Sequence, residues 1–464
     1  MKRTPLSLLA HWAGGQVHGE DVAIEAVSND TRAIVPGSLY VALRGERFDG
    51  HDFAAAARDA GAAALLVERV LDIALPQVVV ADTQLALARI AAGFQAGRGT
   101  QVFAITGSNG KTSVKTLLTA VLTHAAQVQG RSVYATPGNR NNEIGLPLAV
   151  IDAPEDAHWA IYEMGAGKPG DIAYLTDIAP PRFALVNNIA SAHIERMGSL
   201  SGVAATKGAI YAALPADGTA VINADDAFAP WLEQHCVGTP PRCGVLRFAL
   251  DVPAEVSARD IVAGEDGSRF VLVTPAGEVP VQLALPGRHN VRNALATAAL
   301  ALAAGIALEL VAEGLAQARP VAGRQVAHML GNGAVLVDDS YNANPGSLAA
   351  AIDALAACGQ PAWLVLGDMR ELGGQGRALH AAAGEQARAA GLARVWTLGE
   401  LADAASSAFG EGGRHFASHE ALAAALADEL PAGARCLVKG SRGSAMDKIV
   451  TALLRRGEET HHVV

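Results

Sequence analysis

Short apolar runs alternate along the chain with longer segments in which apolar residues recur at helical spacing. The run Val102–Ile105 is typical of a buried strand. In the segment that follows, the apolar residues recur every three or four positions and predict an amphipathic helix: Val114, Leu117, Leu118, Val121 and Leu122. Because this rhythm of strand and helix recurs, the pattern predicts an α/β fold built on parallel sheets, whose ligands gather beyond the carboxyl ends of the strands.

Changes in this pattern divide the chain into three expected domains. Residues 1–98 predict a small α/β domain with short strands and alanine-rich helices. Residues 99–317 predict a central domain with a parallel sheet, and an insert at about 245–285, with turn signals at Asp266-Gly267 and Ala276-Gly277, predicts β-hairpins. After Arg319-Pro320, residues 318–464 resemble a small Rossmann-like unit, and the polar tail from Arg455 is expected to fray. Further strands are expected at Leu39–Leu43, Ala64–Val67, Gln77–Ala81, Trp159–Tyr162, Phe183–Val186, Thr219–Ile222, Val335–Val337, Trp363–Leu366, Val395–Leu398 and Cys436–Val438.

Composition narrows the class of protein. Although half of the 464 residues are hydrophobic, no uninterrupted apolar stretch reaches the roughly 18 residues of a membrane span, and no convincing signal peptide follows Met1. We therefore expect a cytoplasmic enzyme without membrane insertion. A net charge of −10 argues against general binding of nucleic acid. The four cysteines are scattered and have no adjoining histidines, so we expect neither a zinc site nor a disulfide framework.

The segment Thr106–Ser113 has the composition of a phosphate-binding loop between a strand and a helix. Backbone N–H groups at the start of that helix would point at an anion, Lys111 would reach the outer phosphates of a triphosphate, and the Thr112 hydroxyl would hold Mg²⁺. The full P-loop pattern asks for a glycine where this chain has Ile105, so the short motif alone is also compatible with a chance loop. The loop residues predicted to contact the nucleotide are Gly107, Ser108, Asn109, Gly110, Lys111, Thr112 and Ser113.

Two side chains that follow predicted strands are candidate metal ligands. Glu163 follows the strand Trp159–Tyr162 and would face the phosphate loop, although a surface carboxylate that caps a turn is the alternative. His193 lies just past the next strand, which we expect to neighbour the strand before Glu163. A lone histidine is more often structural than a ligand.

Several longer strings together resemble the ATP-dependent Mur ligases of cell-wall synthesis, in order and spacing across the whole chain. General family features are the phosphate loop, Glu163, His193-Ile194-Glu195, Lys207 within Ala205–Tyr211, and Pro286–Asn293. A second group resembles the branch of the family that attaches a D-alanyl-D-alanine dipeptide: Asp30-Thr31-Arg32, Leu43–Phe53, Gly138–Gly145, Asp338–Pro345, Leu366–Gly373 and Lys439–Arg442.

The resemblance implies a reaction. The family uses ATP to phosphorylate a peptide carboxylate, and an amine then displaces phosphate from the acyl phosphate. In this chain Lys111, together with Mg²⁺ held by Thr112, Glu163 and His193, would neutralise the charge that develops. By the same resemblance, Lys207 would carry CO₂ as a carbamate that supports a second Mg²⁺. Without the resemblance, Lys207 would be interpreted as a solvated lysine on a helix.

The resemblance also implies residues for each substrate. Asn290, Asn293, Arg324 and Asp339 would hold ATP across two domains, although helix capping is an alternative for the two asparagines. A UDP-N-acetylmuramoyl-tripeptide would contact Ser28, Thr31, Arg32 and Gly45 through its uridine diphosphate, and Asn139, Asn141 and Asn142 through its muramoyl-peptide arm. The dipeptide would contact Asn342, Asn344, Lys439, Ser441 and Arg442, residues that could equally shape turns.

Other functions stay open at this point. Another Mur ligase or a folylpolyglutamate synthase would share the ATP site but need a different first domain and acceptor pocket, and the strings Asp338–Pro345 and Leu366–Gly373 count against it. A catalytically silent nucleotide-binding partner of wall-synthesis proteins would be expected to lose Lys111, Glu163 or His193, and all three are present. We expect a monomer.

Overall fold

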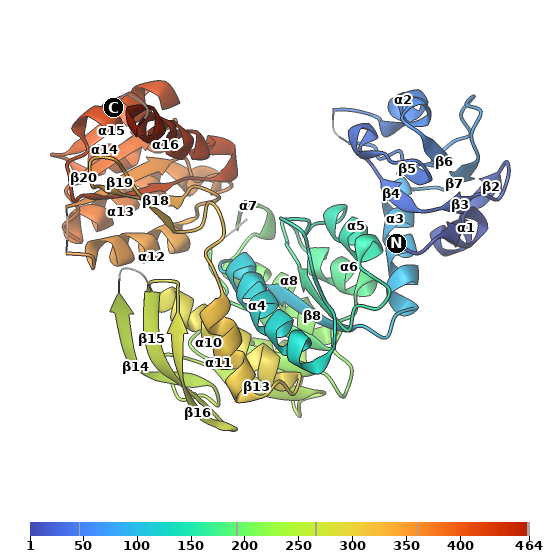
Figure 1. Ribbon diagram of the computed structural model, residues 1–464, viewed down its shortest axis with the longest axis horizontal. Coiled ribbons are helices and arrows are strands. Elements are labelled where there is room, and N and C mark those ends of the chain that lie inside the picture. The colour runs from blue at the N-terminus through green and yellow to red at the C-terminus, as the bar shows by residue number, and fades with distance from the viewer. Residues whose placement is uncertain (46, 192–193, 265–266, 360, 462–464) are drawn as a thin grey trace.

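The computed structural model describes residues 1–45, 47–191, 194–264, 267–359 and 361–461. The chain forms three lobes in sequence order, with the central lobe joined to the other two (Figure 1). Each outer lobe contains one larger sheet, and the central lobe contains a parallel sheet and an antiparallel one. The predicted α/β class is therefore confirmed. No helix within the described residues is long and apolar enough to cross a membrane.

The first lobe is a five-stranded sheet packed against three helices. Its strands β4, β5, β6 and β7 pair in parallel, and β2 adds to β7 in antiparallel orientation. A short antiparallel pair joins β1 to β3. The elements are β1 (Thr4–Pro5), α1 (Leu6–Ala13), β2 (Gln16–His18), β3 (Ala23–Ile24), β4 (Ala26–Ser28), β5 (Ser38–Val41), α2 (Ala54–Asp59), β6 (Ala62–Val67), β7 (Gln77–Val79) and α3 (Thr83–Ala96).

The central lobe is built on a six-stranded parallel sheet. Its strands in spatial order are β13 (Gly244–Phe248), β12 (Thr219–Asn223), β11 (Phe183–Val186), β8 (Gln101–Thr106), β10 (Trp159–Glu163) and β9 (Val133–Ala135). We expected the strand before His193, β11, to neighbour the strand of Glu163, β10. This expectation is wrong, because the two strands are not adjacent. Instead β8 lies between them and pairs with both. The phosphate loop therefore leaves the sheet at its middle, with polar residues on either side of it.

Successive side chains of β8 point to opposite faces of the sheet, and helices cover both faces. Val102 and Ala104 pack in a core with α3, α5, α6 and α8, whereas Phe103 and Ile105 pack in a second core with α4, α10 and α11. The helices of the central lobe are α4 (Lys111–Gln129), α5 (Gly145–Asp152), α6 (Asp171–Ile178), α7 (Ile194–Met197), α8 (Leu200–Ala212), α9 (Ala229–Leu232), α10 (Arg288–Ala303) and α11 (Leu308–Gln317).

The predicted β insert is an antiparallel three-stranded sheet of β14 (Ser257–Gly264), β15 (Gly267–Thr274) and β16 (Gly277–Leu283). Of the two predicted turns, Ala276-Gly277 connects β15 to β16, and Asp266 lies outside the described residues. Phe270, Leu272 and Val281 join the same apolar core as α4 and α10.

The third lobe is a six-stranded sheet with helices on both faces. Strand β17 is antiparallel to β18, and the other neighbours are parallel. We expected the chain to fray from Arg455. This prediction is wrong for the residues up to His461, because α16 continues to that residue. In spatial order the strands are β17 (Val326–Met329), β18 (Val335–Asp339), β22 (Arg435–Lys439), β19 (Ala362–Gly367), β20 (Arg394–Leu398) and β21 (Gly413–Phe416), and the helices are α12 (Pro345–Ala356), α13 (Gly376–Ala389), α14 (Asp403–Phe409), α15 (His419–Glu429) and α16 (Asp447–His461).

Candidate active site

The phosphate loop connects β8 to α4 through two glycines in unusual backbone conformations. Gly107 has φ 148° and Gly110 has φ 78°. A Cβ atom on Gly110 would lie 2.4 Å from Asn187 Nδ2 and 2.7 Å from Asn293 Oδ1. Both the left-handed backbone and the close approach of these amides therefore require glycine at this position. The Lys111 ammonium folds back over the loop and donates to the Gly107 carbonyl over 2.8 Å, and burial lowers the pKa of Lys111.

Asn187 and Asn188, at the end of β11, form one wall of the loop. The Asn109 N–H donates to Asn188 Oδ1 over 2.8 Å, and Asn187 Nδ2 donates to the Asn109 carbonyl over 3.0 Å. Asn187 Oδ1 is buried and has no hydrogen-bond partner in the described part of the chain. These two asparagines were not among the predicted site residues. Their position directly after a buried strand was a signal that could have identified them.

Glu163, the last residue of β10, forms the opposite wall. Its Oε2 accepts a hydrogen bond from Thr112 Oγ1 over 2.9 Å, and its Oε1 accepts one from Asn141 Nδ2 over 2.7 Å. Lys115 Nζ lies 3.4 Å from Oε2. Burial would raise the pKa of Glu163, but Lys115, Lys111 and the two hydrogen bonds outweigh that effect and hold the pKa below its usual value. Glu163 is therefore a buried, ionised carboxylate, and its interpretation as a surface turn cap is wrong.

The donor set at this wall fits Mg²⁺. A threonine hydroxyl and a carboxylate lie side by side at the phosphate loop, and both are the hard oxygen ligands that Mg²⁺ prefers, with phosphate oxygens and water completing its shell. Among the described residues no three side chains of His, Cys, Asp or Glu gather into a metal-binding group. The third predicted ligand, His193, lies outside the described residues.

Arg324 brings the third lobe to the same point. Its Nη2 donates to Thr112 Oγ1 over 3.0 Å, and its guanidinium lies 4.3 Å from the centre of the Tyr341 ring. Arg324 Nε is buried and has no hydrogen-bond partner within the described residues. The guanidinium therefore retains an unused donor at the phosphate site.

Asp339 and Lys439 form a buried ion pair at the carboxyl ends of β18 and β22. Lys439 Nζ donates to Asp339 Oδ2 over 2.6 Å and to the Asn342 carbonyl over 3.1 Å. These two predicted site residues, one assigned to ATP and one to the dipeptide, thus contact each other directly.

Asn290 and Asn293 lie inside α10 and face the phosphate loop. Asn290 Nδ2 donates to the Pro286 carbonyl over 2.7 Å, and Asn293 Oδ1 accepts from Asn187 Nδ2 over 3.1 Å. Gly287 is the N-cap residue of this helix, so helix capping is the wrong interpretation of the two asparagines. They belong to the row of amides beside the loop.

Lys207 is buried in α8, with 1% of its surface exposed, so the interpretation as a solvated lysine is also wrong. Burial lowers its pKa well below the usual value, and the neighbouring charge of Lys111 acts in the same direction. Its side chain has no hydrogen bond to another described residue.

A cleft of about 810 Å³ between the central and third lobes collects most of the predicted site. The predicted residues among its lining are Ser108, Asn109, Gly110, Lys111, Thr112, Ser113, Asn139, Asn141, Asn142, Glu163, Asn290, Asn293, Arg324, Asp339, Asn342, Asn344 and Lys439. Sequence analysis missed several others, including Asn187, Asn188, Arg196, His289, Gln325 and Tyr341.

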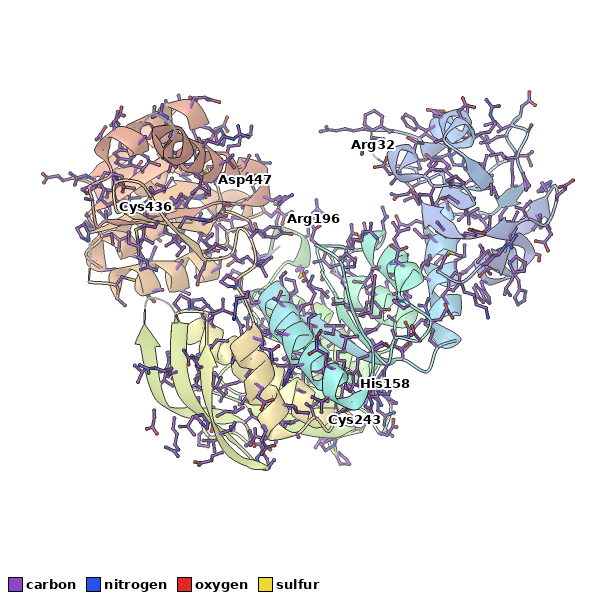
Figure 2. The ribbon with its side chains drawn as sticks, in the orientation of Figure 1. Arg32, His158, Arg196, Cys243, Cys436 and Asp447 are labelled. Atoms are coloured by element: carbon purple, nitrogen blue, oxygen red, sulfur yellow. The ribbon has the colours of Figure 1, made fainter. Side chains whose placement is uncertain are left out.

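Other predicted residues lie outside this lining: Gly107, Lys207, Ser441, Arg442 and, in the first lobe, Ser28, Thr31, Arg32 and Gly45. Figure 2 shows Arg32 on the first lobe and Arg196 where the central and third lobes approach each other. Arg32 pairs with Asp30 over 2.7 Å at an exposed position. Arg442 is close to the cleft even so, because its guanidinium lies 5.2 Å from the ring centre of Tyr341.

Comparisons with known proteins agree with this arrangement. Three family models match the chain: the catalytic domain of the Mur ligase family at residues 23–95, the Mur ligase middle domain at 105–301, and the glutamate ligase domain of Mur ligases at 324–442. The UDP-N-acetylmuramoyl-tripeptide--D-alanyl-D-alanine ligase of Escherichia coli is 44% identical over 97% of this chain and 98% of that protein.

Two solved structures extend the match to the fold. A crystal structure of MurF from Acinetobacter baumannii has a TM-score of 0.90 at 30% identity, covering 98% of this chain and 100% of that one. The MurF ligase of Thermotoga maritima in complex with ADP has a TM-score of 0.82 at 27% identity, covering 94% and 98%. Together with the phosphate loop, Glu163 and Arg324 in one cleft, this likeness along nearly the whole chain shows that the protein belongs to the Mur ligase family, in its MurF-type branch.

Proposed function

We propose that this chain is an ATP-dependent ligase that joins D-alanyl-D-alanine to the terminal carboxylate of a UDP-N-acetylmuramoyl-tripeptide, releasing ADP and phosphate, for peptidoglycan precursor synthesis. One observation carries the proposal. Lys111, the Thr112–Glu163 pair and Arg324 converge on a single cleft that also contains asparagines from five separate segments. Such a site can bring a triphosphate and a carboxylate together.

The chemistry has two steps, and both involve anions. A carboxylate oxygen attacks the γ-phosphorus of ATP, which forms an acyl phosphate and releases ADP. The amine then attacks the acyl carbon, phosphate leaves, and the amine nitrogen loses a proton. Lys111 and Arg324 would neutralise charge on the phosphates in the first step. A Mg²⁺ ion held by Thr112, Glu163 and, we propose, His193 would supply further positive charge there.

Lys207 is proposed to act as a carbamate. The lowered pKa of Lys207 increases the fraction of its amine that is neutral at a given pH, and a neutral amine can add to CO₂. The amine nitrogen would form a bond to the carbon of CO₂ and release a proton, and the resulting carbamate anion could support a second Mg²⁺.

The remaining roles follow the predicted division of the chain at 1–98, 99–317 and 318–464. Asn290, Asn293 and Asp339 would hold the nucleotide together with the phosphate loop. Residues Ser28, Thr31, Arg32 and Gly45 of the first lobe would bind the uridine diphosphate, and Asn139, Asn141 and Asn142 the muramoyl-peptide arm. We further propose that the protein acts as a monomer in the cytoplasm, where ATP is available.

Asn342, Asn344, Lys439, Ser441 and Arg442 would form the acceptor pocket. The dipeptide's carboxylate lies one residue beyond its attacking amine, so a cation placed to bind it cannot also orient the nearer carboxylate of a single amino acid. Because Lys439 is already paired with Asp339, Arg442 is the better candidate for this cation.

The test is phosphate release with ATP, Mg²⁺, the UDP-muramoyl-tripeptide and each acceptor amine in turn. D-Alanyl-D-alanine should support release, and D-glutamate or L-lysine should not. Arg442→Ala should raise the KM for the dipeptide and leave ATP binding unchanged. Release with a single amino acid would favour another Mur ligase or a folylpolyglutamate synthase, and ADP binding without release under any condition would favour a silent nucleotide-binding partner.

A further inference from the structure

Lys115 is a buried cation to which the proposed chemistry gives no role. It lies one helical turn after Lys111 in α4, and 6% of its surface is exposed. Its ammonium donates to the carbonyls of Gly138 over 2.6 Å and Thr136 over 3.1 Å, and lies 3.4 Å from Glu163 Oε2. Burying an ammonium group is costly unless it is paired and hydrogen-bonded, and here all three partners come from two other segments.

Three side chains, including Lys115, surround the Glu163 carboxylate. Lys115 and Thr112, both on α4, contact Oε2, and Asn141 contacts Oε1. The segment Thr136–Asn142, which carries Asn141, is in turn held by Lys115 through its first and third carbonyls.

Backbone N–H groups at and after Glu163 also donate to the Thr136–Asn142 segment. The Glu163 N–H donates to Thr136 Oγ1 over 3.2 Å, and the Gly165 N–H donates to the Asn141 carbonyl over 2.7 Å. The Glu163 carboxylate and the Thr136–Asn142 segment are therefore connected to each other, and the Lys115 ammonium contacts both.

We propose that Lys115 is a positioning residue that couples the metal-binding carboxylate to the Thr136–Asn142 segment. Its charge fixes the Glu163 carboxylate in the orientation that presents an oxygen to the cation beside Thr112. Its two carbonyl contacts fix the segment whose Asn139, Asn141 and Asn142 line the same cleft. Lys115 itself does not line the cleft, so it would act through Glu163 and the segment rather than by touching the substrates.

The proposal rests on the proposed function only in assigning Mg²⁺ to Thr112 and Glu163, and its test needs neither the muramoyl peptide nor the dipeptide. The full chain would be titrated with ADP by calorimetry, once with Mg²⁺ and once with a chelator. Lys115→Met keeps most of the side chain's length and removes its charge and its donors. Partners that orient metal ligands are typically worth about 10–100-fold in metal affinity, so the Mg²⁺-dependent gain in ADP affinity should fall by at least about ten-fold.

A second measurement separates positioning from a general loss of charge. Amide hydrogen exchange without nucleotide should rise at Glu163 and Gly165 in Lys115→Met, because their N–H groups donate to the segment that Lys115 holds. The matched control is Lys168→Met, which removes the same charge from an exposed lysine that lines the cleft. The control should change neither the Mg²⁺-dependent gain nor the exchange at these amides.

The outcomes are distinct. An unchanged Mg²⁺-dependent gain in Lys115→Met, or an equal loss in Lys168→Met, would overturn the proposal. If Lys115→Met does not fold, Lys115→Gln, which keeps an amide donor, should give an intermediate loss, and a wild-type gain in that variant would equally overturn it. If wild-type protein binds ADP in a Lys115-dependent, Mg²⁺-dependent manner but does not ligate the dipeptide, the proposed function fails and the role of Lys115 stands.

Discussion

Arg324 and Thr112, which are 212 positions apart in the sequence, are joined by a 3.0 Å hydrogen bond from the guanidinium Nη2 to the threonine hydroxyl. Thr112 also donates to Glu163, so one hydroxyl connects the phosphate loop, the neighbouring strand and the start of the third lobe. The proposed nucleotide site is thus shared between two lobes. Catalysis by such a site depends on the relative position of those lobes as much as on any single side chain.

Lys111→Ala should nearly abolish turnover and leave the fold intact. Lys111 lies over the phosphate loop and is not part of an apolar core. Loss of one positioned electrostatic contact should lower kcat by roughly 100-fold or more. Phosphate release measures the effect, and a thermal melt checks the fold. A rate near wild type would contradict the assignment of Lys111 to the phosphates.

Lys207→Ala should be inactive and regain part of its activity with added short carboxylic acids, because an acid could occupy the vacated space and restore the negative charge of a carbamate. Lys207→Arg should stay inactive, since a guanidinium cannot be carbamylated. Activity would be measured across a series of formate and acetate concentrations, with Lys111→Ala as the control that no acid should rescue. Full activity of Lys207→Ala without acid would show that the lysine takes no part in the reaction.

The depressed pKa of Lys207 also predicts how stability depends on pH. Below the folded pKa of Lys207, the native chain bears the full cost of a buried ammonium. The cost disappears as the pH rises to the ordinary lysine pKa of 10.5, because between the two pKa values only the unfolded chain binds the proton. In CO₂-depleted buffer, Lys207→Met should therefore be more stable than wild type at low pH, by a margin that shrinks as the pH rises. Denaturant unfolding at several pH values measures the margin. A margin independent of pH would contradict a buried, titrating lysine.

Asn344 has two separable roles. Its Oδ1 accepts from the Ser347 N–H over 2.9 Å as the N-cap of α12, and its Nδ2 donates to Asn109 Oδ1 in the phosphate loop over 2.6 Å. Asn344→Ala should lose about 1 kcal/mol of stability and also bind ADP more weakly. Asn344→Ser keeps a capping oxygen but is too short to reach Asn109, so it should retain stability and still bind ADP more weakly. Wild-type ADP affinity in both variants would show that the contact with Asn109 has no effect on the nucleotide.

The pattern of apolar and polar residues along the sequence predicted much of the architecture. Apolar runs identified strands such as β8 and β11 because fully buried parallel strands are continuous in hydrophobicity, and their polar ends identified Glu163. The order of strands in the central sheet was not predictable in the same way. Local sequence shows where strands end, but the placement of β8 between β10 and β11 depends on how the connecting helices pack.

Three features that local sequence did not predict share a physical cause: the position of Lys115, the burial of Lys207 and the helical end of the chain. The sequence pattern predicts Lys115 as a polar position of an amphipathic helix. Only the fold brings Glu163 and the Gly138 carbonyl next to it. Lys207 likewise lies in a helix whose apolar residues do not form a single narrow stripe, so its burial depends on tertiary packing. The helical end of the chain was missed because polar composition was taken as a sign of fraying, whereas α16 packs Ile449, Val450 and Leu453 into the core of the third lobe.

The fate of one oxygen atom tests whether the reaction passes through an acyl phosphate. If a carboxylate oxygen of the muramoyl peptide attacks the γ-phosphorus of ATP, that oxygen leaves with phosphate when the dipeptide amine displaces it. UDP-muramoyl-tripeptide labelled with ¹⁸O in its terminal carboxylate would be incubated with the protein, ATP, Mg²⁺ and D-alanyl-D-alanine, and the released phosphate analysed by mass spectrometry. We expect one ¹⁸O atom in each phosphate, formed together with the amide product. Unlabelled phosphate, or label in AMP, would contradict it.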